Sequence, residues 1–499
     1  MGDKKKHIKQ PGFGDRNISA IEHHQQKGKT FVPPLKNIPN LQFTSWTDLC
    51  LPDSLWLVLL SGNLERNHYF EISKKILNQV KKNAESLKDF APIHSSFREL
   101  SPDLFDKIFS EFSSDPKVSK IFSALLAYEE LPDRDHWKRN FPKPDPKKQW
   151  NLIARGVGKC FPHQSQKATD CRWFRVMWLF AIDKIRFAEG MEDFVEAVLR
   201  YPENEDLSAS RIRASEIAFR QSEISPLDEK WAETFWRAGW KNTSCVIPDW
   251  KPEKGKGYEN LKSEIMKIYD YLIDHFTETL EITSPNPRHD GAFGIVMYIL
   301  QTLLLTAVPL NANSSLGRLS LRCILEAYLT LKFLCREDKE TIWAQYRNHG
   351  NSAAKLAFLK NLREAELPES IDLNELENYA NEDLWMEFQN IELGVWSNKN
   401  LREMAQLTGE KTLYDKFYDI LSGYSHSNWF SIRDTIFTTC LNPLHRFHRV
   451  PFLPKFEMLD VTPDACKIAN LALEELNSLY PTIKQRIHWH QKKDKSETG

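Results

Sequence analysis

The sequence predicts an all-α protein with two helical domains, of which the C-terminal one is an antiparallel helix bundle. From residue 45 onward, most segments repeat apolar residues at helical spacing, with Asp, Ser or Pro near their starts. Alternating polar and apolar runs, which are typical of strands, are nearly absent. The 499 residues, 41% of them hydrophobic, exceed the usual length of one domain and suffice for more than one core.

Four regions follow one another along the chain. Residues 1–44 form a basic arm that ends in FVPPLKNIP, and its Pro content favours an extended or polyproline-like structure. Residues 45–247 are expected to form the N-terminal helical domain, and the stretch PDWKPEKGKGYEN at 248–260 has the Pro, Gly and charge typical of a domain boundary. Residues 257–488 are expected to form the C-terminal bundle, and residues 489–499 a polar tail.

The bundle is predicted from helical patterns joined by short connections, which favour antiparallel neighbours. Its two most apolar helices should form the centre. The expected helices are 257–283, 289–309, 314–335, 338–362, 372–390, 398–427 with a break, 428–439 and 461–488.

The stretch 291–310 carries no charge and has about the length of a membrane span. Gln301 and Thr302 interrupt it, and Pro309 closes it. A buried core helix is therefore the better interpretation, and no membrane partner is expected.

Charge and cysteine usage exclude several classes of protein. Lys and Arg number 67 against 68 Asp and Glu, so no global basic field indicates a nucleic-acid or membrane partner. Eight cysteines without a signal peptide indicate reduced thiols in the cytoplasm. Cys160, His163 and Cys171 are close in sequence but lack a second pair of ligands, so neither a metal nor a cofactor is predicted.

Familiar catalytic motifs are missing or incomplete. The stretch ARGVGKC resembles a phosphate-binding loop, but Ile153 replaces its first glycine and Cys160 its final hydroxyl residue. No HExxH zinc helix, GxSxG elbow or GxGxxG loop after a strand is present. The sequence thus gives no support to metalloprotease, hydrolase or dinucleotide-binding functions.

The first candidate site lies in SLGRLSLRCILEAYLTLKFL. Arg318, Arg322 and Glu326 are spaced four residues apart and share one face of a helix, with leucines pointing the same way. Charges embedded in apolar surface require partners. Arg322 and Glu326 therefore form either an internal structural bridge or part of a functional site.

The second candidate lies in YDKFYDILSGYSHSNWF, where Tyr414, Tyr418, Ser422 and His426 recur every four residues. A histidine that titrates near neutrality is the usual proton shuttle, although a lone histidine is more often a core or capping residue. Both interpretations of His426 remain open here.

The third candidate is WAQYRNHGNSAAK. Arg347, Asn348 and His349 are suited to contacting a phosphate, but the end of a helix turn is the stronger interpretation because Arg and His are common on surfaces.

The C-terminal half also resembles a known family. The stretches GRLSLRCILEAYLTLKFL, YRNHGNSAAK and LSGYSHSNWF are similar to a bacterial helical family of unknown function, DUF5677, over about residues 257–450. The specific parts are Arg322 with Glu326 and Ser422 with His426. The resemblance implies a helical fold and brings no established activity.

The helical arrangement is distantly similar to HEPN domains, which are common in prokaryotic toxin and antiphage systems and often cut RNA as dimers. HEPN ribonucleases carry an Arg, usually followed by a polar residue, and a His a short distance beyond. Arg347 and Asn348 begin such a motif, but no His follows at the required distance, whereas Arg16, Asn17 and His23 have the spacing but lie in the arm. The HEPN motif is therefore not found in the bundle.

Two functions are expected. In the first, the chain is a cytoplasmic bacterial protein of a defence or mobile-element setting, and a polar site in its C-terminal bundle binds or acts on RNA or a nucleotide. In the second, a non-enzymatic interaction or regulatory module holds the same residues as a structural network and binds a protein partner or a second copy. In the first function, Arg322, Glu326 and His426 are the catalytic candidates, and Arg318, Arg347 and His349 bind phosphate.

Overall fold

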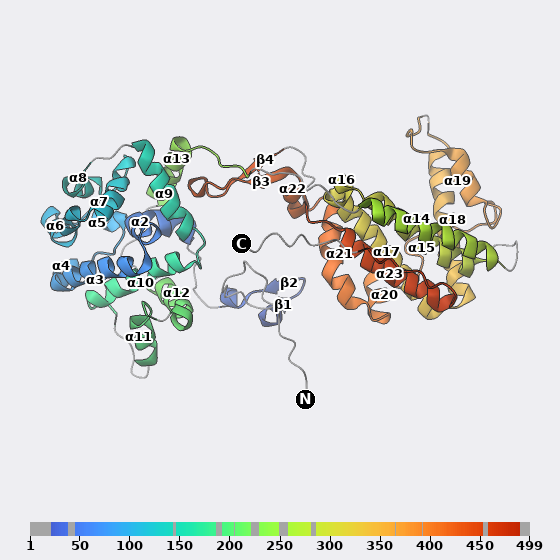
Figure 1. Cartoon of the computed structure of the whole chain (residues 1–499), viewed down its shortest axis with the longest axis horizontal. Helices are drawn as coiled ribbons and strands as arrows, with labels where there is room; N and C mark the ends of the chain where they lie inside the picture. Colours follow the sequence, from blue (N-terminus) through green and yellow to red (C-terminus); the bar gives the residue numbers. More distant parts are fainter. Residues whose placement is uncertain are drawn as a thin grey trace. The chain divides into compact units, whose positions relative to one another are not determined.

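The computed structural model describes residues 21–37, 45–142, 146–185, 192–203, 205–220, 229–248, 258–280, 286–364, 366–391, 393–452 and 458–489. Helices dominate these residues, and the only sheets among them are two pairs of three-residue strands (Figure 1). The prediction of an all-α protein is confirmed.

The chain divides into two compact units. The first comprises Met1–Pro248 together with Thr439–Arg449, and the second comprises Asp249–Thr438 together with Val450–Gly499. The sequence predicted that residues 439–449 belong to the C-terminal bundle, but their contacts lie with the first unit. In chain order, Asp249–Thr438 of the second unit are thus inserted between the two parts of the first, and the rest of the second unit follows them.

The first unit is built around the helix α2, whose residues Leu55–Gly62 are all buried. Trp56 lies at its centre, with its ring centroid 5.4 Å from those of Phe109 and Phe174. The α-helices of this unit are α1 Leu51–Asp53, α2 Leu55–Asn63, α3 Arg66–Lys82, α4 Ala84–Leu87, α5 His94–Phe97, α6 Pro102–Phe109, α7 Pro116–Ser123, α8 Arg134–Asn140, α9 Pro146–Cys160, α10 Gln166–Ala181, α11 Glu192–Leu199, α12 Glu205–Arg220 and α13 Glu229–Asn242.

Short 3-10 turns, a π-helical turn at Trp46–Cys50 and short strands complete the first unit. Strand β1 pairs antiparallel with β2, so part of the arm predicted as extended forms a hairpin. Residues 1–20 and 38–44 of the arm, Arg16 and Asn17 among them, lie outside the described ranges. The turns are η1 Ile21–His23, η2 Pro34–Asn37, η3 Trp46–Cys50, η4 Ser110–Ser114, η5 Ala124–Ala127 and η6 Pro443–His445, and the strands are β1 Gln25–Lys27 and β2 Thr30–Val32.

Two glycines allow α2 and α9 to cross in close contact. A Cβ atom added to Gly62 would lie 2.5 Å from the Cα of Gly156. Gly156 belongs to the stretch that resembles a phosphate-binding loop, but it lies inside helix α9. Its lack of a side chain serves helix packing rather than phosphate binding.

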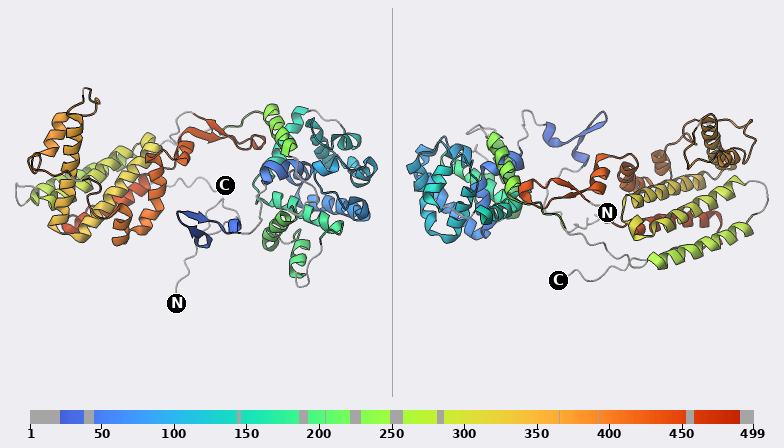
Figure 2. Two further views of the ribbon diagram at one scale, coloured as in Figure 1. Left: turned by 180° about the vertical axis from the view of Figure 1, so that it is seen from behind. Right: turned by 90° about the horizontal axis from the view of Figure 1, so that it is seen from above.

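The second unit is a helical bundle in which α14, α15, α17 and α23 lie side by side (Figures 1 and 2). Local interactions fix both ends of helix α17. The side chain of Ser314 caps its first turn by accepting a hydrogen bond from the N–H of Leu316, and Asp338 ends the helix in a left-handed conformation with a φ of 35°. The helices are α14 Tyr258–Glu278, α15 Pro287–Thr306, α16 Pro309–Ala312, α17 Ser315–Glu337, α18 Glu340–Asn361, α19 Leu373–Ala380, α20 Leu401–Leu407, α21 Lys411–Ser425, α22 Trp429–Ile436 and α23 Thr462–Leu479.

Several predicted helices end earlier in the structure than expected. The helix expected at 372–390 ends at Ala380, and the one expected at 461–488 ends at Leu479, just before Pro481. The helix expected at 428–439 ends at Ile436, and the chain continues into β3 Phe437–Thr439, which pairs with β4 Arg449–Pro451.

The break expected within 398–427 lies between α20 and α21, where Gly409 has a φ of 83°. Among the described residues, no helix combines the length and the hydropathy needed to cross a membrane.

Candidate functional site

The predicted residues of helix α17 face the C-terminal part of α21. Arg322 is the centre of this contact: its Nε donates to Oε1 of Glu326 at 2.7 Å, and its Nη1 donates to Oγ of Ser425 at 2.7 Å. Its guanidinium also lies 5.2 Å from the ring centroid of Tyr418. The four-residue spacing of Arg322 and Glu326 therefore produces the ion pair that the sequence predicted, and the same Arg322 side chain ties α17 to α21.

Arg322 and Glu326 differ in their exposure to solvent. Its side chain is 15% exposed and that of Glu326 is 39% exposed. Burial lowers the pKa of Arg322, but the carboxylate of Glu326 more than compensates and leaves the pKa above its ordinary value. The pair is therefore accessible to solvent on the Glu326 side.

His426 ends α21 beside this contact. Its backbone N–H donates to the carbonyl of Ser422 at 3.1 Å, and the same carbonyl lies 3.5 Å from Nη1 of Arg322. The next residue, Ser427, has a φ of 51° and turns the chain away. The side chain of His426 is exposed, and within the described part of the chain no hydrogen-bond or ion-pair partner contacts its imidazole. The imidazole is thus free to meet a ligand from solvent.

Arg318 lies one turn before Arg322 on α17, and its Nη1 donates to the carbonyl of Ala312 at 3.4 Å. Tyr424 of α21 interacts with Arg318 and donates its hydroxyl to Oδ2 of Asp434 at 2.8 Å. Burial and the contact with Asp434 raise the pKa of Tyr424 to about 12. Arg318, Arg322, Glu326 and His426 thus come together along the contact of α17 with α21.

Arg347 and His349 lie elsewhere, on helix α18. Arg347 bonds the carboxylates of Asp290 and Asp383, and its Nη2 lies 3.3 Å from Oε1 of Glu382. The hydrogen bond to Asp383 outweighs burial and raises the pKa of Arg347. Nε2 of His349 lies 3.1 Å from the carbonyl oxygen of Gly394. The structure does not bring these two residues into the contact of α17 with α21.

Arg347 lines a cavity of about 320 Å³ between α15, α17 and α18. Asp290 and Glu382 line the same cavity, as does Ala327, the neighbour of Glu326. Since three carboxylates surround the single guanidinium, the local charge repels a phosphate. Arg347 is therefore poorly suited to the phosphate-binding role predicted for it.

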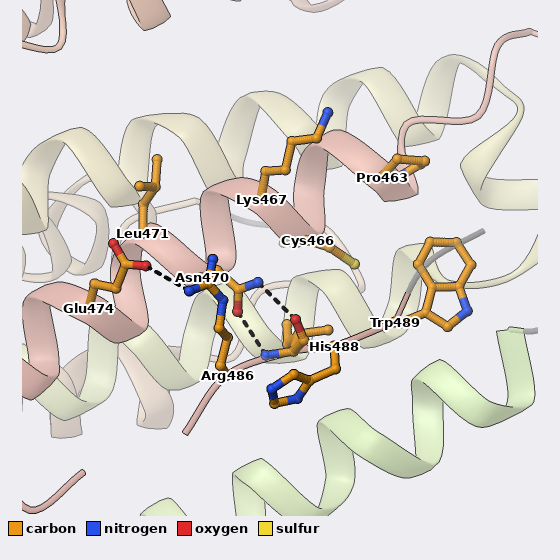
Figure 3. A pocket seen from close by; sticks show the side chains of 10 residues that line it. Pro463, Cys466, Lys467, Asn470, Leu471, Glu474, Arg486, His488 and Trp489 are labelled. Atoms are coloured by element: carbon orange, nitrogen blue, oxygen red, sulfur yellow. Dashed lines mark hydrogen bonds and ion pairs between the residues drawn. The ribbon is translucent and has the colours of Figure 1, made fainter. Parts of the chain in front are cut away.

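A larger cavity of about 900 Å³ lies between α23 and the segment that follows it (Figure 3). Asn470 closes one wall through two hydrogen bonds to the backbone of Ile487, at 2.9 and 2.8 Å. Arg486 lies 3.6 Å from Glu474 across the opening. None of the six predicted site residues lines this cavity.

Sequence reasoning missed a cluster of four potential metal ligands in the first unit. Cys245, Cys440, His445 and His448 each present one ligand atom, and all four atoms lie within 4.8 Å of one another. The spacing from Cys440 to His445 to His448 is a local signal, but Cys245 is far away in sequence. Cys160 and Cys171, which the sequence analysis weighed as ligands, are instead buried in the core.

Comparison with known proteins gives one match. Residues 313–440 match the family of unknown function DUF5677. The matched segment begins just before α17 and contains Arg318, Arg322, Glu326 and His426, so the resemblance to DUF5677 is confirmed over these residues. Neither the curated proteins nor the solved structures include a match to the chain.

Proposed function

We propose that the contact of α17 with α21 is a site for the phosphate of RNA or of a nucleotide, in a protein of a defence or mobile-element setting. One observation carries this proposal: Nη1 of Arg322 donates to Ser425, whose neighbour in the chain is the exposed His426. A fixed guanidinium, a hydroxyl and an accessible imidazole are thereby placed at one end of α21.

The residues of this site have distinct proposed roles. Glu326 orients the guanidinium of Arg322, which contacts a phosphate oxygen in exchange for its bond to Ser425. Arg318 adds positive charge one turn away, and His426 moves a proton at the phosphate or at an attacking hydroxyl. Arg347 and His349 have no part in this version of the site.

A second candidate is the non-enzymatic interaction module, and a specific observation favours it. Arg322 donates to Glu326, Ser425 and the Ser422 carbonyl, and Arg347 is held by three carboxylates. In this alternative the polar residues form a structural network, and the bundle binds a protein partner or a second copy.

The test compares the wild-type chain with His426→Ala in an assay of cleavage of total bacterial RNA at matched protein concentrations. His488→Ala is the matched control, because His488 is another exposed histidine of the second unit and lies outside the site. We expect the wild type and the control to cut and His426→Ala to lose at least about 100-fold in rate, the usual effect of removing an acid–base group.

A binding measurement separates phosphate recognition from cleavage. If no variant cuts, a fluorescent oligoribonucleotide is titrated against the wild type and Arg318→Gln at low salt. Arg318 makes one long hydrogen bond and interacts with Tyr424, so circular dichroism first checks that the variant is folded. Weaker binding by Arg318→Gln supports the site, whereas equal binding, or none by either chain, overturns it in favour of the interaction module.

A further inference from the structure

We infer that Cys245, Cys440, His445 and His448 form a zinc site that fixes the segment 439–449 to the end of α13. All four residues belong to the first unit, and the site is independent of the proposed contact of α17 with α21. Two thiols and two imidazoles are a ligand set that zinc prefers, and four protein ligands without an open position are typical of a structural site.

The distances between the ligand atoms fit tetrahedral zinc. Sγ of Cys245 lies 3.5 Å from Nδ1 of His445 and 3.4 Å from Nε2 of His448, and Sγ of Cys440 lies 3.6 Å from Nδ1 of His445. In a tetrahedron with Zn–S bonds of about 2.3 Å and Zn–N bonds of about 2.05 Å, sulfur and nitrogen lie about 3.5 Å apart. These three sulfur–nitrogen distances match that value, and the remaining pairs of ligand atoms lie within 4.8 Å of one another.

A hydrogen bond to the backbone orients the imidazole of His445 for binding zinc. Nε2 of His445 lies 3.3 Å from the backbone carbonyl of Thr243, to which it donates as Nε2–H. The proton on Nε2 leaves the lone pair on Nδ1, which faces the two cysteines. A histidine that binds zinc through one ring nitrogen usually donates the N–H of the other to a carbonyl or carboxylate, which fixes the orientation of the ring.

The backbone of the segment brings both histidines to one side. Arg446 and Phe447 have φ values of 51° and 48°, and these two left-handed residues turn the chain between His445 and His448. The N–H of Cys440 donates to the carbonyl of His448 at 2.9 Å, which closes the turn. Three of the four ligands are thus presented by one short loop.

The fourth ligand follows α13, against which this loop packs (Figure 1). Nδ2 of Asn442 donates to the carbonyl of Ser244, and the N–H of Leu441 donates to the carbonyl of Val246, so hydrogen bonds flank Cys245 on both sides. The ring of Trp240 covers the histidines, with its centroid 4.5 Å from that of His445. The loop therefore packs against the same segment, after α13, that supplies Cys245.

Zinc content tests the inference directly. The full chain, purified without added metal, is dialysed and its metal is measured by plasma mass spectrometry. We expect one zinc per chain in the wild type and in Cys323→Ser, the matched control with an exposed cysteine outside the cluster. Cys245→Ser, which also changes an exposed cysteine, should bind zinc more than about 100-fold more weakly, since loss of an outer support alone costs 10–100-fold.

Two further measurements keep the inference falsifiable. Replacement of zinc by Co²⁺ in the wild type should give the visible absorption of a tetrahedral thiolate site, and Cys245→Ser should change that spectrum. Thiol titration of the denatured, unreduced wild type should find all 8 cysteines once zinc is removed. A metal-free protein that lacks two of these thiols contains a disulfide instead, and that result overturns the inference, as does a zinc content unaffected by Cys245→Ser.

Discussion

Sγ of Cys245 and Nδ1 of His445 lie 3.5 Å apart although the two residues are 200 positions apart in the sequence. Almost all of the intervening chain forms the second unit. A metal bound between them would join the two ends of this insertion and hold residues 439–449 on the first unit. Such a metal would act together with the hydrogen bonds of Leu441 and Asn442, which already hold this segment on the N-terminal unit.

The crossing of α2 and α9 should not tolerate a side chain at Gly62. We expect Gly62→Ala to lower the free energy of unfolding by about 1–3 kcal/mol, because the new Cβ would meet the backbone of Gly156 at 2.5 Å. Gly294→Ala is the control, since its Cβ meets nothing within 4 Å and alanine favours the helix by about 1 kcal/mol. Urea denaturation followed by circular dichroism measures both, and equal effects would contradict the close crossing.

A buried polar pair should stabilise the first unit. Nδ1 of His94 lies 2.8 Å from Oδ1 of Asp133, whose other oxygen accepts a hydrogen bond from the Trp137 indole at 2.8 Å. Both side chains of the His94–Asp133 pair are fully buried, so Asp133→Ala leaves two donors without an acceptor and should cost about 2–5 kcal/mol. Replacement of the exposed Glu129 by Ala should change the unfolding free energy by less than about 0.5 kcal/mol.

The packing of α17 against α21 should contribute stability that depends more on Arg322 than on Glu326. Arg322→Ala removes bonds to Glu326 and Ser425 and the contact with Tyr418, and should cost about 1–3 kcal/mol. Glu326→Ala removes one half-exposed partner and should cost about 0.5 kcal/mol or less. Chemical denaturation of the two variants gives the comparison, and a larger effect for Glu326→Ala would contradict the role of Arg322 as the tie.

An acid-sensitive ion pair closes the end of α17. Arg288 donates Nε to Oδ1 of Asp338 at 2.7 Å and Nη2 to Oδ2 at 2.9 Å. These bonds to Arg288, which outweigh the effect of burial, lower the pKa of Asp338 below its ordinary 3.8. The folded-state pKa is depressed, so the stabilisation is fully present above pH 3.8 and is lost as the pH falls through the folded-state value.

Thermal melts at a series of pH values measure this contribution. Asp338→Asn should lose less stability than the wild type as the pH falls from 3.8, because the asparagine has no proton to bind. Asp274→Asn, at an exposed position of α14, is the control. Identical acid profiles for the wild type and Asp338→Asn would show that the pair does not contribute.

The sequence determined the all-α class and the position of most helices, because helical hydrogen bonds are local and the apolar period is visible in one segment at a time. It likewise determined the pair of Arg322 with Glu326, which needs only one turn of one helix. Helix ends were less certain, since α19 and α23 stop where caps and a following proline outweigh the periodicity.

Only the tertiary structure decided which distant residues meet. It brought Ser425, the neighbour of His426, to Arg322, surrounded Arg347 with three carboxylates, and placed Cys245 beside the loop of Cys440 and His445. Each of these contacts joins separate segments of the chain, and the packing of whole helices and loops, which no local periodicity encodes, sets their geometry.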